Sequence, residues 1–150
     1  IMKIALYQPD MAGNVGTIIR MCSCLGLDLD IIEPCGFPFD RDRIKKSGLD
    51  YIDDVNINRY ISFEDFREKN KGCRIILLST KASENYRKFR FEKNDILMAG
   101  RESAGVPDSV HESVDARVLI PMVPNRRSLN VAMSVAMVTS ECLGQVDNNL

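Results

Sequence analysis

Short apolar runs alternate with helical segments along this chain, and this alternation limits the possible folds more than any other feature. The runs are apolar on both faces, a pattern typical of a parallel sheet that helices cover on both sides. The strands that we expect are Ile4–Tyr7, Leu29–Ile32, Arg74–Ser79, Ile96–Ala99 and Arg117–Ile120, while the segment 55–61 is ambiguous. The sequence therefore predicts an α/β fold.

Capping residues mark the helices between these runs. The helices that we expect are Val15–Leu25, Arg41–Ser47, Ser62–Lys69, Pro107–Glu112 and Ser128–Leu143. The predicted N-caps are Asn14, Asp40, Ser62 and, for the last helix, Ser128 or Asn125. Gly26 follows the first helix, where a residue in the left-handed conformation commonly ends a helix.

The size of the chain suits one domain, spanning residues 1–150. Its formal net charge of −1 does not imply general binding to nucleic acid, although local basic patches remain available. The five cysteines form no C-x-x-C pair, which favours reduced thiols in a cytoplasmic protein. No apolar run approaches the roughly 18–20 residues of a membrane-spanning helix, so we expect no membrane partner.

Three of the expected strands end in residues that form loops, at 78–80, 99–102 and 120–122. Ligands of an open parallel sheet bind beyond the carboxyl ends of its strands, so these three loops could converge on one pocket. Gly100 and Gly105 would let a ligand approach the backbone closely. Each loop taken alone is also compatible with a simple turn.

The pattern Asn14-x-Gly16-x-x-x-Arg20 lies at the start of the first predicted helix. Gly16 and Arg20 lie on one helical face, and helical side chains lean toward the N-terminus, so Arg20 could reach over Gly16 toward the helix start. Free N–H groups and a guanidinium there would bind an anion. The alternative interpretation is a capped surface helix with an ordinary arginine.

Several kinds of site are disfavoured. The chain contains neither a P-loop motif nor a G-x-G-x-x-G fingerprint. His111 is the only histidine, which excludes a histidine-based triad or a histidine-rich metal site, and we expect it on the surface. No metal is therefore predicted.

The segment 120–132 joins a short apolar run to a helix that is apolar nearly all round. Such a helix is buried on most faces, either inside the domain or in a dimer interface. Two prolines, two arginines, Ser128 and Asn130 lie in this segment, which makes it a candidate for a loop that holds a ligand.

Three segments in this order resemble the motifs of the SpoU-type SPOUT RNA methyltransferases. They are Asn14-x-Gly16-x-x-x-Arg20, Gly100-Arg-Glu102-Ser-Ala-Gly105, and Ile120-Pro-Met122 followed by Ser128-Leu129-Asn130. Each motif is weak alone, whereas the ordered set is specific and covers nearly the whole chain. Further runs, at 6–9, 32–37, 48–51 and 121–124, are similar to the minimal subfamily that 2′-O-methylates the wobble nucleotide of tRNA.

The resemblance implies an α/β sheet whose C-terminal part forms a deep trefoil knot, and a homodimer. It implies S-adenosylmethionine as methyl donor, S-adenosylhomocysteine as product, and the tRNA anticodon region, with cytidine or a modified uridine as target. The cofactor site that it implies consists of Leu78, Ser79, Gly100, Glu102, Gly105, Ile120, Met122, Ser128, Leu129 and Asn130. Many relatives have glycine where Pro124 stands, whereas the wobble subfamily resembles this chain at that position.

The catalytic residues that the resemblance implies are Arg20, Asn14, Glu102, Ser128 and Asn130. A guanidinium stays protonated, so we favour Arg20 as a ligand of phosphate or of the developing alkoxide rather than as a base. Asn14, Ser128 and Asn130 would orient ribose and cofactor. Glu102 could hold Arg20, bind the cofactor ammonium or accept the proton, and the sequence does not choose among these.

Basic residues that could hold RNA form three clusters: Arg41, Arg43, Lys45 and Lys46; Lys81, Arg87, Lys88 and Arg90; and Arg126 and Arg127. Each cluster could equally be solvated surface charge.

Two other functions compete with methyl transfer to RNA. One is a non-catalytic RNA-binding module that kept the fold, and the other is a small-molecule methyltransferase.

Overall fold

The computed structural model describes residues 2–46, 50–126 and 129–146. Its strands are β1 (Lys3–Tyr7), β2 (Leu29–Ile32), β3 (Ile57–Tyr60), β4 (Ile75–Leu78), β5 (Ile96–Ala99) and β6 (Ala116–Val118). Its helices are α1 (Ala12–Leu25), α2 (Arg41–Lys46), the 3-10 helix η1 (Asp50–Asp54), α3 (Phe63–Lys69), α4 (Asp108–Ser113) and α5 (Val131–Val146). The predicted α/β class is confirmed, and the ambiguous segment contains strand β3.

All six strands join one sheet in the order β3-β2-β1-β5-β4-β6, and every pairing of neighbouring strands is parallel. From β1 the chain first builds outward through β2 and β3, then crosses to the other side of β1 for the remaining strands. The loops after β1 and β5 therefore diverge at the centre of the sheet. Such a switch point is where open α/β sheets bind ligands.

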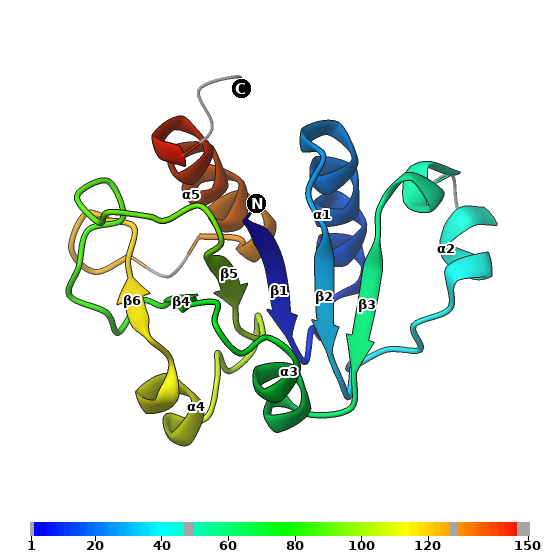
Figure 1. Ribbon diagram of the computed structural model, residues 1–150, viewed down its shortest axis with the longest axis horizontal. Coiled ribbons are helices and arrows are strands. Elements are labelled where there is room, and N and C mark those ends of the chain that lie inside the picture. The colour runs from blue at the N-terminus through cyan, green and yellow to red at the C-terminus, as the bar shows by residue number, and fades with distance from the viewer. Residues whose placement is uncertain (1, 47–49, 127–128, 147–150) are drawn as a thin grey trace.

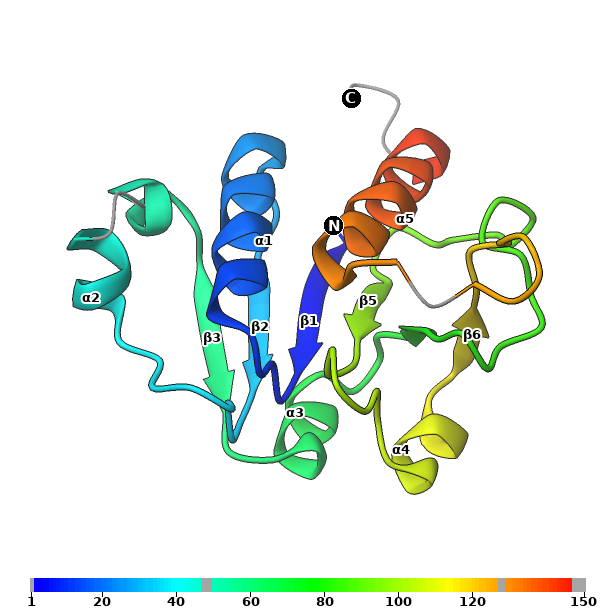
Figure 2. The ribbon, with the colours of Figure 1, turned by 180° about the vertical axis from the view of Figure 1, so that it is seen from behind.

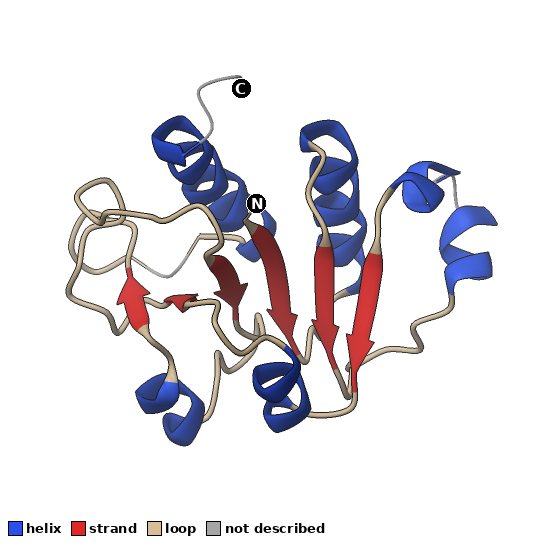
Figure 3. Ribbon diagram, in the orientation of Figure 1, coloured by secondary structure: helices blue, strands red, loops and turns tan. Residues whose placement is uncertain are grey.

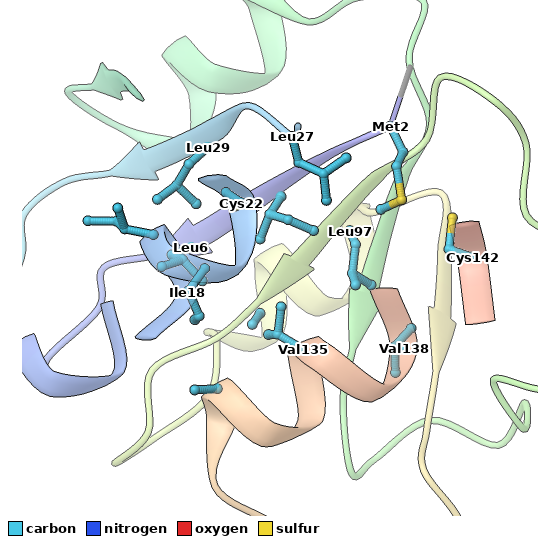
Figure 4. Close-up of a cluster of buried hydrophobic side chains, with 14 of the residues drawn as sticks. Met2, Leu6, Ile18, Cys22, Leu27, Leu29, Leu97, Val135, Val138 and Cys142 are labelled. Carbon is cyan, nitrogen blue, oxygen red and sulfur yellow. The ribbon is translucent and has the colours of Figure 1, made fainter. Parts of the chain in front are cut away.

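Helices cover both faces of the sheet (Figures 1 and 3). Turning the molecule shows α1 and α5 together on one face, and α3 and α4 on the other (Figure 2). The larger core cluster lies under α1 and α5, where Ile18, Val135 and Val138 pack against Leu6 and Leu97 of the strands (Figure 4). The last helix is thus part of the core of a single chain.

The helix caps were only partly predicted. Gly26 ends α1 with a φ of 68°, Asp40 accepts bonds from the first N–H groups of α2, and Ser62 caps α3, as expected. The prediction for Asn14 is wrong, because α1 begins at Ala12 and its N-cap is Met11. Asn14 lies inside the first turn, which frees its side chain for contacts with other segments.

The last strand ends earlier than predicted, and the last helix begins later than predicted. β6 ends at Val118 because the backbone of Leu119 bonds instead to Glu84 and Tyr86, at 2.8 and 3.0 Å. Ile120 therefore lies in a loop. The prediction that Asn125 caps α5 is wrong, since the N–H of Met133 donates to Asn130 Oδ1 at 3.2 Å. The other predicted cap, Ser128, lies outside the described residues.

Phe66 belongs to the smaller core cluster, which lies between the sheet and the α3–α4 layer. Its ring is fully buried and packs edge-on against Tyr60, with centroids 5.4 Å apart. We expect Phe66→Ala to lower the free energy of unfolding by about 3–5 kcal/mol, because removing the ring leaves a cavity in the core. Ile61→Ala, at a side chain that is 81% exposed, should change it by less than about 0.5 kcal/mol in the same urea titration. Equal destabilisation of both variants would contradict this packing.

Candidate active site

A cavity of about 240 Å3 lies at the carboxyl ends of β4 and β5 and beside the loop that follows β6. Its walls come from the three loops that the sequence singled out, so their predicted convergence is confirmed. Eight of the predicted cofactor residues line it: Leu78, Ser79, Gly100, Glu102, Gly105, Ile120, Met122 and Leu129. The other lining residues include three basic or titratable side chains that were not predicted for the cofactor site: Lys81, Arg101 and His111.

The loop 100–105 forms one side of the cavity and is closed on itself. Arg101 and Gly105 exchange backbone hydrogen bonds of 3.0 and 2.9 Å, and Gly105 has a φ of 61°. A Cβ on Gly100 would lie 2.7 Å from the carbonyl carbon of Gly105. The sequence suggested that glycine at position 100 lets a ligand approach the backbone. The structure adds a second reason, because the loop packs against itself at this position.

Three polar side chains from distant segments meet beside this cavity. Glu102 Oε1 accepts a hydrogen bond from Asn14 Nδ2 at 3.1 Å, and Asn14 Oδ1 accepts one from Asn130 Nδ2 at 3.0 Å. An ionised carboxylate only accepts hydrogen bonds and the N–H of Met133 only donates, so both ends of this chain of bonds fix the direction of the two amides. The structure thus brings Glu102, Asn14 and Asn130 into direct contact.

Asp10 is a further member of the site, and the sequence analysis missed it. The N–H of Asp10 donates to Glu102 Oε2 at 3.3 Å, and the N–H of Glu102 donates to Asp10 Oδ1 at 3.2 Å. Ser103 Oγ also donates to Asp10. These reciprocal bonds tie the loop after β1 to the loop after β5. The available signal was an acidic residue in the first turn after β1, which is too common to single out.

The two carboxyl groups influence each other's ionisation. Burial and then the neighbouring carboxyl of Asp10 raise the pKa of Glu102 above its usual range. The hydrogen bond with Glu102 lowers the pKa of Asp10. When one proton is shared between them, it therefore resides mainly on Glu102.

A third loop supports Asp10 from behind. The N–H of Gly36, which follows β2, donates to the carbonyl of Pro9 at 2.9 Å. A Cβ on Gly36 would lie 2.7 Å from the Cβ of Asp10, so no larger residue fits without moving one of the two loops. The position of Asp10 is consequently fixed from both sides.

Arg20 lies away from this cluster, contrary to the expectation that it reaches the start of its helix. It is six residues after Asn14, about 9 Å along the helix axis. Its guanidinium lies over the ring of Tyr51 in η1, 5.6 Å from the centroid. The anionic partner at the start of α1 is Glu102 of the chain itself.

We expected His111 on the open surface, but it is half-buried and lines the cavity wall. Two other predicted residues, Ser128 and Arg127, lie outside the described residues. Within the described ranges, no group of three His, Cys, Asp or Glu residues could hold a metal ion, and no helix is long and apolar enough to cross a membrane.

Known proteins resemble this chain over nearly its full length. A tRNA (cytidine(34)-2'-O)-methyltransferase of Beijerinckia indica subsp. indica is 53% identical, over 95% of this chain and 91% of that protein. A crystal structure of a Bacillus anthracis protein is 36% identical with a TM-score of 0.90, and covers 97% of this chain and 94% of that one. A structure described as giving insight into 2-OH methylation of C/U34 on tRNA is 33% identical, with a TM-score of 0.88 and coverage of 96% and 95%.

The family comparison covers all three loops of the cavity and the Asp10–Asn14 segment. The sequence model of the SpoU rRNA Methylase family matches residues 1–140. Together with a relative that is more than half identical, this match shows that the chain belongs to the SpoU methylase family.

Proposed function

We propose that this protein transfers a methyl group from S-adenosylmethionine to the ribose 2′-hydroxyl of the wobble nucleotide, cytidine or a modified uridine, in the tRNA anticodon. The observation that carries the proposal is the Glu102–Asn14–Asn130 cluster, which joins one residue from each of the three family motifs at the edge of a cavity lined by the second and third motifs. The relative that is 53% identical bears the name of this activity, which supports tRNA rather than rRNA as the substrate.

The cavity fits the adenosine part of S-adenosylmethionine. Leu78, Ile120 and Leu129 supply apolar walls, and the loops around them supply backbone donors and acceptors, the combination that nucleoside sites use. Glu102 supplies an acidic group to a ligand that carries positive charge. When bound, the cofactor supplies the electrophilic methyl group and leaves as S-adenosylhomocysteine. The other residues of the proposed cofactor site are Ser79, Gly100, Gly105, Met122, Ser128 and Asn130.

The protein contributes mainly positioning to the reaction. Asn14 and Asn130, whose amides are fixed in direction, would hold the ribose with its 2′-hydroxyl toward the cavity, together with Ser128. Glu102 is the group we assign to the proton of that hydroxyl, because its raised pKa makes it a better proton acceptor than an ordinary carboxylate. Asp10 acts through Glu102 and is a positioning residue.

Arg20 requires a partner to take part in this site. Met11, Met133 and Met137, at the start of α1 and along α5, are between 37% and 56% exposed. We propose that they are covered in a homodimer, in which Arg20 faces the cavity of the partner and stabilises the developing alkoxide or holds phosphate. We also propose that residues 1–150 form a single domain with a C-terminal trefoil knot, and that the enzyme is cytoplasmic.

The decisive experiment is nucleoside mass spectrometry of tRNA incubated with the protein and S-adenosylmethionine. We expect a 2′-O-methylated wobble nucleoside, and calorimetry should detect binding of the cofactor alone. Cofactor binding without methylation of any RNA would point to a small-molecule substrate. Absence of both would favour a non-catalytic RNA-binding module.

Arg20→Ala should lower kcat for tRNA methylation by about 10²–10³-fold, because the variant removes one charged donor from the reacting centre. Cofactor affinity should persist, since Arg20 does not line the cavity. Thr17→Ala, on the same helix at an exposed position, is the matched control and should keep full turnover. If coexpression of Arg20→Ala and Glu102→Gln protomers restores activity, Arg20 acts across the subunit interface. Normal turnover of Arg20→Ala would contradict a role for Arg20 in the reaction.

Asp10→Asn should lower the pKa of Glu102, because the second carboxyl that disfavours its ionisation is removed. Glu102 would then stay ionised to lower pH, and the acidic limb of the methylation rate should move in the same direction. Carbon-13 NMR titration of the Glu102 carboxyl measures the pKa directly. Thr17→Ala, which leaves both carboxyls and their hydrogen bonds in place, is the control. A pKa of Glu102 that is unchanged or higher in Asp10→Asn would contradict the assigned coupling.

A further inference from the structure

A basic turn, residues 84–91, lies between β4 and β5 in the green loop of Figure 2. Five of the thirteen residues from 81 to 93 are Lys or Arg and two are Glu, in a chain whose formal net charge is −1. Positive charge is therefore concentrated in and around this turn.

The basic turn is fixed to the rest of the fold through its backbone. Gln145, near the end of α5, donates to the carbonyl of Phe89 at 3.0 Å and accepts from the N–H of Phe91 at 2.8 Å. Arg74, itself paired with the buried Asp95 at 2.7 Å, donates to the carbonyl of Arg90 at 3.2 Å. In these contacts the turn uses its backbone, and its basic side chains take no part.

The apolar side chains of the turn point into the domain. Tyr86 and Phe91 are buried, and the rings of Phe89 and Phe91 pack edge-on with centroids 4.9 Å apart. Because these rings are anchored inward, the basic side chains of Arg87, Lys88 and Arg90 lie on the outer side. They line a hollow of about 340 Å3 with Phe89, Phe91 and Gln145.

Lys88 and Arg90 have no acidic partner, unlike several basic residues elsewhere on the surface. Within residues 2–46, 50–126 and 129–146, Lys88 and Arg90 form no ion pair, and the side chain of Arg87 lies over the ring of Tyr86, 5.4 Å from the centroid. By contrast, Lys69 and Lys71 pair with Asp65 and Glu68, at 3.1 and 2.9 Å. Arg41 and Lys45, in another cluster that the sequence proposed for RNA, both pair with Asp53.

The location of the turn sets its distance from the proposed reaction. The start of the turn bonds to Leu119, next to the cavity loop, whereas its end, at Phe89 and Phe91, is held by Gln145 near the end of α5. Asn130 joins the polar cluster at the other end of α5. The 16 residues of α5 span about 24 Å. A ligand that touches both must span this length and must carry negative charge where it meets the turn.

We propose that Arg87, Lys88 and Arg90 bind the phosphate backbone of the RNA substrate about one helix length from the nucleotide that is methylated. The inference rests on the proposed function and adds a second contact surface to it. Phosphates are recognised by unpaired Arg and Lys groups, and a turn that is already ordered loses little entropy on binding. The surface contributes affinity, while the reacting groups stay at the other end of α5.

The test compares two double variants that each remove two exposed positive charges, Lys88→Gln/Arg90→Gln and Lys69→Gln/Lys71→Gln. In the first, we expect KM for full-length tRNA to rise on the order of tenfold, with kcat at saturating tRNA changed by less than about twofold. Its binding should also depend less on salt, with the slope of log K against log salt smaller by about 1 for each phosphate that is no longer bound. The second variant should match the wild type in both measurements.

A shortened hairpin that retains only the anticodon loop and its first base pairs tests the distance. It cannot span α5, so wild type and Lys88→Gln/Arg90→Gln should methylate it with equal KM. Unchanged KM and salt slope on full-length tRNA, in a variant with wild-type thermal stability, would overturn the proposal. Failure of the function itself would differ, because the wild type would then methylate no tRNA at all.

Discussion

Two carboxyl groups join the loops that diverge at the centre of the sheet. Asp10 follows β1 and Glu102 follows β5, and each accepts a hydrogen bond from the backbone N–H of the other. Without this link, the switch point would leave the two loops free to separate. With it, Asn14 is brought to Glu102 and Asn130 to Asn14, so segments 116 residues apart in the chain share one polar cluster.

The same link makes the chemistry of the site depend on a proton. An ionised Glu102 fixes the direction of the Asn14 and Asn130 amides, because a carboxylate can only accept hydrogen bonds. A proton on Glu102 gives that end of the cluster a donor and removes the constraint. Burial and Asp10 both raise the pKa of Glu102 and so favour its protonated form, which makes this carboxyl the group of the cluster best suited to take up a proton.

The fold separates the polar cluster from the cations to which we assign RNA phosphate. The cluster lies at the start of α5, and residues 89–91 of the basic turn are anchored near its end. Arg74 and Gln145 hold the turn through its backbone, which leaves its cations for a partner. Arg20, stacked on Tyr51, lies outside the cluster of its own chain, and this arrangement is the physical reason to expect that a second subunit completes the site.

The sequence by itself determined the α/β class, the positions of most strands and the three loops around the cavity, because apolar runs and glycine-containing turns are local signals. It also identified the family through three ordered motifs. Only the tertiary structure decided that Asn14 contacts Glu102 and Asn130 and does not cap its helix, that Asp10 and His111 belong to the site, and that Arg20 does not join it within one chain. These facts depend on contacts between loops far apart in sequence, for which an isolated Asp, Asn or Arg carries no local signal. The same limit applies to the basic turn, whose composition was visible but whose unpaired cations and place at the end of α5 required the fold.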